Sequence, residues 1–270
     1  MLSPVTTQTD HVCVVQLTDS HLYADAGANL LGLDTFESLQ AVIDLVLAEL
    51  PAIDLVLATG DITQDGSAGG YQRFAGAMGR LPAPSHWIAG NHDDSELMKQ
   101  VGQASGLNRE WVDAGNWRIV PLNSNIPGAV AGHLSASELA LLDRALAGAG
   151  ERFVMVCLHH HPVSIGCGWM EPLGLLNAAE LLTRLEADAR VRVILWGHIH
   201  QHFDQQRGGL RLLASPSTCI QFAPASEDFA TDNQAPGYRW LRLYDDGRVE
   251  TAISRLADGS FQPDPGATGY

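Results

Sequence analysis

Short apolar runs alternate with segments of helical period along the first two thirds of the chain. The runs are rich in β-branched residues and too brief for helices, so we expect them to form buried strands. Strands that alternate with helices in this way are typical of a layered α/β fold. The predicted strands are Val12–Leu17, Ile53–Ala58, His86–Ala89, Arg118–Leu122, Phe153–Leu158 and Val193–Trp196.

Helices are predicted by periodicity and by their starts. Between the first two strands, apolar residues at Leu39, Val42, Ile43, Val46, Leu47 and Leu50 share one face of a helix. A capping residue followed three positions later by Glu indicates where a helix begins. This signal occurs three times, at Asp34 with Glu37, Ser135 with Glu138, and Asn177 with Glu180.

The pattern changes after His200. We expect strands at Leu210–Ala214, Tyr238–Tyr244 and Arg248–Leu256, with a hairpin turn at 245–247, and a long polar loop over 223–237. These strands form either a second sheet or an antiparallel extension of the first. No linker or repeat divides the chain, so we expect one domain over 1–270. Residues 1–203 would carry the chemical motifs, and 204–270 the later strands.

Composition and charge limit the function. With 46% hydrophobic and 17% charged residues the chain is a folded globule. Its formal net charge of −15 argues against nucleic acid and anionic membranes as partners. The four cysteines are far apart and fit neither a zinc–thiolate site nor a disulfide framework, so we expect reduced, partly buried thiols. The N-terminus lacks a secretory signal pattern and no apolar run is long enough to cross a membrane, which predicts a cytoplasmic protein.

Polar clusters follow the carboxyl ends of five predicted strands, the edge at which open α/β sheets bind ligands. An isolated Asp or Gly after a strand usually marks only a turn. Together, however, the clusters supply many oxygen and imidazole donors, and carboxylate with imidazole suits Mn, Fe or Zn. The donors are too many for one catalytic ion and suit two. They are Asp19 and His21, Asp61, Asn91, His159, and His198 with His200.

The order DxH, GD, GNHD, HHHP and GHxH resembles the calcineurin-like metallophosphoesterase superfamily. Further segments extend the likeness over nearly the whole chain, to the bacterial class III 3′,5′-cyclic-AMP phosphodiesterases. These are GCGW at 166–169, Asn177-Ala178, GHIHQ at 197–201, SPSTCIQF at 215–222, APG at 235–237 and RLADGSFQPD at 255–264. The resemblance implies a four-layer α/β/β/α sandwich with two central mixed sheets flanked by helices. It also implies hydrolysis of 3′,5′-cyclic AMP to 5′-AMP, which lowers cellular cyclic AMP.

The resemblance also assigns roles to the site residues. Asp19, His21 and His200 would bind one metal, Asn91, His159 and His198 the other, and Asp61 would bridge them. His160 competes with His159 for its place. The substrate would contact His21, Asp61, Asn91, His92, His159 and His200. The ions would be Fe²⁺ or Mn²⁺, with Zn, Co or Mg as alternatives.

Our hypothesis for the mechanism is that a hydroxide bridging the metals attacks phosphorus, with Asp61 and His92 as the catalytic residues. His92 would protonate or stabilise the departing O3′. Asp93 is one candidate hydrogen-bond partner for a ligand histidine. Trp169 or Phe222 is a candidate to stack on a base, although packing in a covering loop explains both equally well. Asn123 stands where relatives often have Asp, and we expect a turn there.

Two other functions remain open on the sequence alone. The same metal centre could act on another phosphodiester, such as a 2′,3′-cyclic nucleotide, or on a phosphomonoester. A non-catalytic interaction module is disfavoured, because all seven donors and His92 are present. A DNA-processing nuclease is also disfavoured, because the chain has only one lysine, Lys99.

Overall fold

The computed structural model describes residues 10–103 and 110–264, whose strands form two large mixed sheets and a small hairpin. Residues 1–9, in which we expect no secretory signal, lie outside the described residues. The first sheet has the order β13 (Val249–Arg255), β12 (Gly237–Tyr244), β1 (His11–Leu17), β2 (Leu55–Thr59) and β3 (Ser85–Ile88). The second has the order β4 (Val112–Ala114), β5 (Trp117–Pro121), β6 (Phe153–Cys157), β7 (Val191–Trp196), β9 (Leu210–Ala214) and β8 (Phe203–Arg207). The hairpin pairs β10 (Gln221–Phe222) with β11 (Thr231–Asp232).

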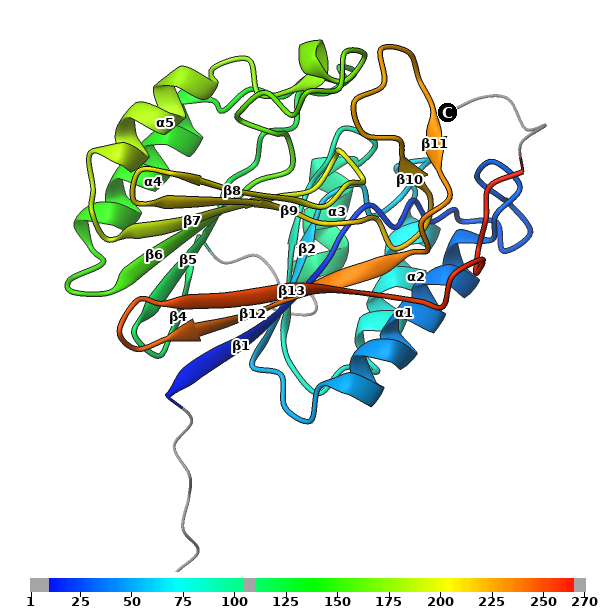
Figure 1. Ribbon diagram of the computed structural model, residues 1–270, viewed down its shortest axis with the longest axis horizontal. Helices are drawn as coiled ribbons and strands as arrows, with labels where there is room; N and C mark the ends of the chain where they lie inside the picture. Colours follow the sequence, from blue (N-terminus) through cyan, green and yellow to red (C-terminus); the bar gives the residue numbers. More distant parts are fainter. Residues whose placement is uncertain (1–9, 104–109, 265–270) are drawn as a thin grey trace, which may run out of the picture.

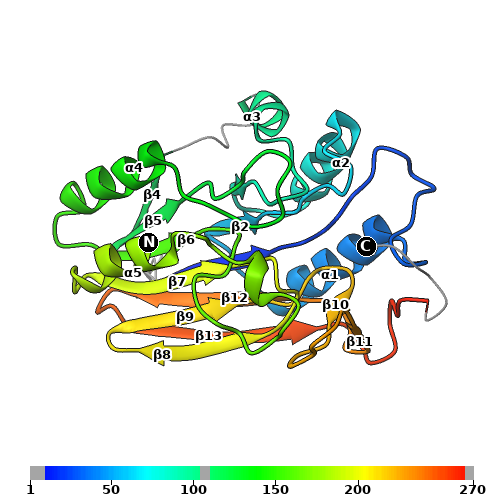
Figure 2. The same ribbon diagram turned by 90° about the horizontal axis from the view of Figure 1, so that it is seen from above.

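The two large sheets pack face to face, with helices on their outer faces (Figures 1 and 2). Alternate residues of each strand make the contact between them, as for Val14 and Leu57 against Met155 and Leu195. The first sheet is covered by α1 (Thr35–Glu49), α2 (Ala68–Met78) and α3 (Ser95–Gln103). The second is covered by α4 (Ala136–Ala147) and α5 (Ala178–Glu186). The predicted four-layer α/β/β/α sandwich is therefore confirmed.

The predicted strands are confirmed, with ends that shift by one or two residues. After β7 the chain contributes strands to both sheets. Strand β9 runs parallel to β7 in the second sheet. In the first sheet β12 pairs antiparallel with β1, and β13 pairs antiparallel with β12. Both alternatives for the later strands therefore apply, to different strands. The polar segment 223–237 also contains the short strand β11, which was not predicted.

All three predicted helix starts are confirmed, and two of them have a side-chain capping bond. The side chain of Asp34 accepts hydrogen bonds from the amides of residues 36 and 37, and that of Ser135 from Glu138 N. Asn177 is the residue before α5, as predicted, but its side chain makes no capping bond. Its Oδ1 accepts from Leu134 N instead, at 2.9 Å, and this bond holds the loop before α4.

The described residues include no helix long and apolar enough to cross a membrane. All four cysteines lie in the described part of the chain, and each is buried and free of a disulfide. The structure thus supports the prediction of buried, reduced thiols.

Candidate metal centre

The predicted ligands lie at one end of the two sheets, directly after five parallel strands. Asp19 and His21 follow β1, and Asp61 follows β2, while Asn91 and His92 come after β3. In the second sheet, His159 follows β6, and His198 and His200 follow β7. The two facing sheets therefore bring residues 179 positions apart in sequence, such as His21 and His200, into one cluster.

The backbone at these strand ends is strained. Five of the predicted ligands, which are not glycines, have positive φ angles of 46° to 67°. Such angles cost on the order of 1–3 kcal/mol each and persist only where the surrounding contacts demand them. In this backbone conformation each side chain points from the end of its strand into the cluster. The five are Asp19, His21, Asp61, His198 and His200.

Three glycines beside these residues allow the close packing. A Cβ atom at Gly60 would lie 2.2 Å from Nδ1 of His159, and one at Gly90 would lie 2.1 Å from Oδ1 of Asp61. A Cβ at Gly197 would lie 2.9 Å from Oδ2 of Asp19. The sequence suggests turns at these glycines, and each also lets the backbone pass close to a side chain of the predicted site.

The side chains form two adjoining groups. In the first, Nε2 of His21 lies 3.1 Å from Nε2 of His200, which is 3.5 Å from Oδ1 of Asp19. In the second, Nε2 of His159 lies 3.1 Å from Oδ1 of Asn91. The carboxylate of Asp61 lies between the groups, with Oδ2 3.3 Å from Nε2 of His159 and 3.8 Å from Nε2 of His21.

Hydrogen bonds outside the groups fix which ring nitrogens face inward. Nδ1 of His200 donates to Ile220 O at 2.8 Å, and Nδ1 of His159 donates to Thr59 O at 2.8 Å. Nε2 of His198 donates to the carbonyl of residue 173 at 3.1 Å, which leaves its Nδ1 for the centre. Nδ1 of His21 donates to Oε1 of Gln64 at 2.5 Å. Such outer partners orient the ligands in metal sites.

The donor set fits divalent cations. With Nδ1 of each ring bonded outward, the Nε2 atoms of His21 and His200 face each other at 3.1 Å, beside two buried carboxylates. A cation between such acceptors relieves their repulsion. Within the described residues, Asp19, His21 and His200 offer ligand atoms within 4.8 Å of one another, as do Asp19, Asp61 and His159. Mixed imidazole and oxygen donors suit borderline divalent metals.

Burial and mutual charge set the protonation of the centre. Burial lowers the pKa of His21 to about 3 and holds that of His198 well below its usual value. Burial opposes ionisation of Asp61, but the imidazoles of His159, His92 and His21 outweigh it and keep its pKa well below the usual range. Burial also opposes the charge on His159, but Asp61 raises the pKa of His159 to about 9. A cation bound here would replace the proton of His159.

The neighbouring histidines 160 and 161 differ from His159. Both ring nitrogens of His160 are engaged outside the centre, Nδ1 with Ser124 Oγ at 2.8 Å and Nε2 with Val130 O at 2.9 Å. Its ring still lies close enough to His159 and His198 to form a third group of potential donors. The ring of His161 stacks on His198, with centroids 5.7 Å apart.

The chain matches the family model described as calcineurin-like phosphoesterase over residues 14–202. It belongs to this family. Every residue of the centre lies within the matched segment. This phosphoesterase also resembles the 3′,5′-cyclic adenosine monophosphate phosphodiesterase CpdA of Pseudomonas aeruginosa, with 56% identity over 96% of this chain and 95% of the relative. The enzyme of the same name from Escherichia coli (strain K12) is 43% identical over 96% of this chain and 95% of that enzyme.

Among solved structures, a dimetal phosphatase from Danio rerio has a TM-score of 0.63 to the phosphoesterase. The alignment covers 91% of this chain and 99% of that one, with 17% identity. At this level of identity the comparison supports the shared fold.

Asp93 holds the phosphoesterase's loops together and does not orient a ligand histidine. Its carboxylate accepts from the backbone amides of Gly90, Ile62 and Thr63 at 2.9–3.1 Å. Burial, with the charge of Asp61, raises the pKa of Asp93 to about 6. It is Gln64 that bonds a candidate ligand, and no motif in the sequence distinguishes that glutamine.

The aromatic candidates also have other roles. Phe222 is 1% exposed and stacks on His200, with centroids 4.1 Å apart and planes 11° apart. Trp169 packs edge-on against Phe222 and Phe229. The structure therefore shows Phe222 packed as part of the cover of the site. Phe222 belongs to β10, so this packing holds the hairpin β10–β11 (Figure 1) against His200.

Proposed function

We propose that this phosphoesterase hydrolyses 3′,5′-cyclic AMP to 5′-AMP and thereby lowers cellular cyclic AMP. The observation that carries the proposal is the pair of donor groups joined by Asp61, in a chain 56% identical to an enzyme named for that activity. The substrate is a small anion, which a protein of net charge −15 binds through metal ions.

We assign Asp19, His21 and His200 to one ion, Asn91, His159 and His198 to the other, and Asp61 to both. His159 is preferred to His160 because only His159 has a ring nitrogen that faces Asp61 and Asn91. Fe²⁺ and Mn²⁺ are our first candidates, with Zn, Co or Mg as alternatives. Two such ions, when bound, act as Lewis acids toward the phosphate and lower the pKa of water.

The protein's own contribution is to orient the phosphate and supply a proton. His21, Asp61, Asn91, His92, His159 and His200 surround the position of the substrate phosphate. The backbone amide of His92 donates to Asp61 Oδ1 at 2.9 Å, which fixes His92 beside the carboxylate. The ring of His92 lies edge-on to that of His21, with centroids 5.0 Å apart. From there His92 donates a proton to the departing O3′.

We treat 1–270 as one domain, because 204–270 supplies strands to both sheets. We also place the protein in the cytoplasm, where four free, buried cysteines stay reduced. Neither nucleic acid nor membrane is proposed as a partner.

The experiment that tests the substrate compares the rates on 3′,5′-cyclic AMP and 2′,3′-cyclic AMP with Mn²⁺ present. We expect the 3′,5′ isomer to be hydrolysed with the higher kcat/KM. A higher kcat/KM for the 2′,3′ isomer would keep the metal centre and contradict the proposed substrate.

A further inference from the structure

A cavity of about 530 Å³ lies beside His92, the proposed proton donor. Asn91 and His92 line one part of it, and Ser95, Asn123 and Asn125 line another. Its volume lies within the roughly 300–1,000 Å³ of small-molecule sites. The residues that line it come from the loops after β2, β3 and β5 and from the start of α3.

We propose that this cavity binds the nucleoside of the substrate and that the amide of Asn123 determines specificity for adenine. The inference rests on the proposed function. In a 3′,5′-cyclic nucleotide both ester oxygens belong to one ribose. If His92 protonates O3′, the ribose must lie on the side of His92, and the base must extend from there.

On the other side of the centre the ring of Phe222 is covered. Phe222 is 1% exposed and stacks on His200, and Trp169 and Phe229 pack against Phe222. A base therefore cannot stack on Phe222 without displacing His200. Among the described residues that line the cavity beside His92, none is Phe, Tyr or Trp.

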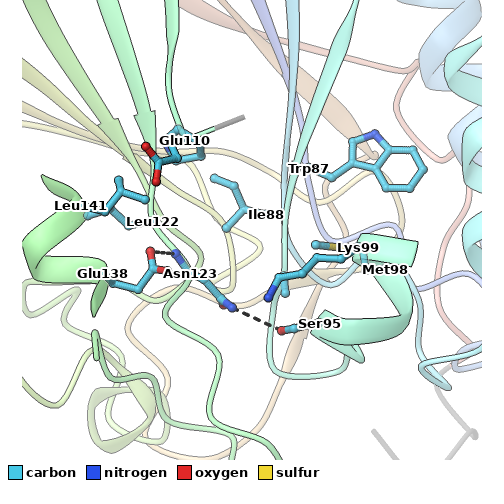
Figure 3. A pocket seen from close by; sticks show the side chains of 12 residues that line it. Trp87, Ile88, Ser95, Met98, Lys99, Glu110, Leu122, Asn123, Glu138 and Leu141 are labelled. Atoms are coloured by element: carbon cyan, nitrogen blue, oxygen red, sulfur yellow. Dashed lines mark hydrogen bonds between the residues drawn. The ribbon is translucent and has the colours of Figure 1, made fainter. Parts of the chain in front are cut away.

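Asn123 is held rigidly where it borders the cavity. Its backbone amide donates to Oε2 of Glu138 at 2.9 Å, and its Oδ1 accepts from Asn125 N at 3.0 Å. This second bond is the turn expected from the sequence. Nδ2 donates to Ser95 Oγ at 3.4 Å, so the side chain reaches from the loop after β5 toward the start of α3 (Figure 3). The Ser95–Asn123 bond lies where this cavity meets a second, more apolar one of about 230 Å³.

The amide of Asn123 suits adenine better than guanine. A carboxamide has two N–H donors and an oxygen with two lone pairs, so one of each remains after the bonds to Ser95 and Asn125. Adenine presents N7 as acceptor and its N6 amino group as donor, which an Asn amide pairs with at both atoms. Guanine presents two acceptors, N7 and O6, at the same edge. The Oδ1 atom of Asn123 would repel O6.

The test uses 7-deaza-3′,5′-cyclic AMP, which lacks the N7 acceptor, together with the variants Asn123→Asp and Asn123→Ala. For the wild-type protein with Mn²⁺, we expect kcat/KM to be roughly 5- to 150-fold lower for the 7-deaza analogue than for cyclic AMP, the range for a bidentate amide–adenine pair. In both variants this ratio should fall to near one. Asn233→Asp, an exposed position outside the cavity, should keep the wild-type ratio.

Equal rates on the two nucleotides in the wild-type protein, or the same ratio in wild type and variants, would overturn the inference while leaving the proposed function intact. The wild-type comparison keeps the test decisive even where a variant fails to fold. If the wild-type protein hydrolyses bis(4-nitrophenyl) phosphate but neither nucleotide, the proposed function fails, and the inference fails with it.

Discussion

The Nε2 atoms of His21 and His200 lie 3.1 Å apart, in a buried site where the Nδ1 atoms of both rings already donate to other acceptors. Neither Nε2 of a neutral ring can donate to the other. The carboxylates of Asp19 and Asp61 lie 3.5 Å and 3.8 Å from these nitrogens and add negative charge. We expect a cation between these groups to stabilise the arrangement.

Metal removal should therefore destabilise the protein. Ligand present at 100 times its Kd stabilises a fold by about 2.7 kcal/mol, so we expect chelator-stripped protein to melt at a lower temperature and to recover with Mn²⁺. His200→Ala should lower the bound metal from two ions to one. The measurements are calorimetry and metal content. His133→Ala, at an exposed histidine, is the matched control and should bind two ions. Two ions in His200→Ala would contradict the assignment.

Substitution of His92 should slow the reaction without loss of metal. We expect His92→Gln to lower kcat on cyclic AMP by about 10²- to 10⁴-fold, the contribution of a well-placed acid. For a phosphodiester with a 4-nitrophenolate leaving group, which needs no proton, the same substitution should lower kcat much less. Steady-state kinetics on both substrates and metal content check this. A loss of bound metal in His92→Gln would instead make His92 a ligand, a role its position near His21 and Asp61 permits.

His159 and His160 should respond differently to substitution. His159→Ala removes the nitrogen that faces Asp61, so we expect it to bind one metal ion fewer. His160→Ala removes two hydrogen bonds to Ser124 and Val130, and we expect lower stability with two ions still bound. Metal content and urea unfolding separate the two effects. The reverse pattern would show that His160 is the ligand.

Gly90 should not tolerate a side chain. In Gly90→Ala the new Cβ would overlap Oδ1 of Asp61, and displacement of that carboxylate should lower metal affinity. The control is Gly76→Ala within α2, where a Cβ meets nothing within 4 Å. That change should raise the free energy of unfolding by about 0.5–1 kcal/mol. Isothermal titration with Mn²⁺ measures the metal affinity, and urea unfolding measures the free energy of unfolding. Unchanged metal affinity in Gly90→Ala would contradict the packing argument.

The longer strands and the polar residues that follow them could be predicted from the sequence, because apolar strands and their polar ends are local patterns. Helix α2 could not be. Its two adjacent glycines weaken the helical signal, yet they are needed because a Cβ at Gly69 or Gly70 would strike Ala24 or Thr63. That contact depends on tertiary packing, which a local pattern does not record.

The hydrogen-bond partners that orient the histidines of the site could not be predicted from the sequence either. Gln64 carries no motif, and the other ring nitrogens bond to backbone carbonyls, which every residue has. Asp93 lies next to His92 in sequence, but its carboxylate turns to the backbone amides of Ile62 and Thr63. Which neighbour a side chain faces is decided by the fold.

Product analysis tests the central claim most directly. Metal-stripped protein would be reloaded with Mn²⁺ or Fe²⁺ and incubated with 3′,5′-cyclic AMP, with Asp61→Ala in parallel because Asp61 lies between the two donor groups. We predict metal-dependent formation of 5′-AMP by the wild-type protein and none by the variant. Hydrolysis of bis(4-nitrophenyl) phosphate with no 5′-AMP formed would contradict the proposed substrate, and no hydrolysis of either compound would contradict the catalytic centre itself.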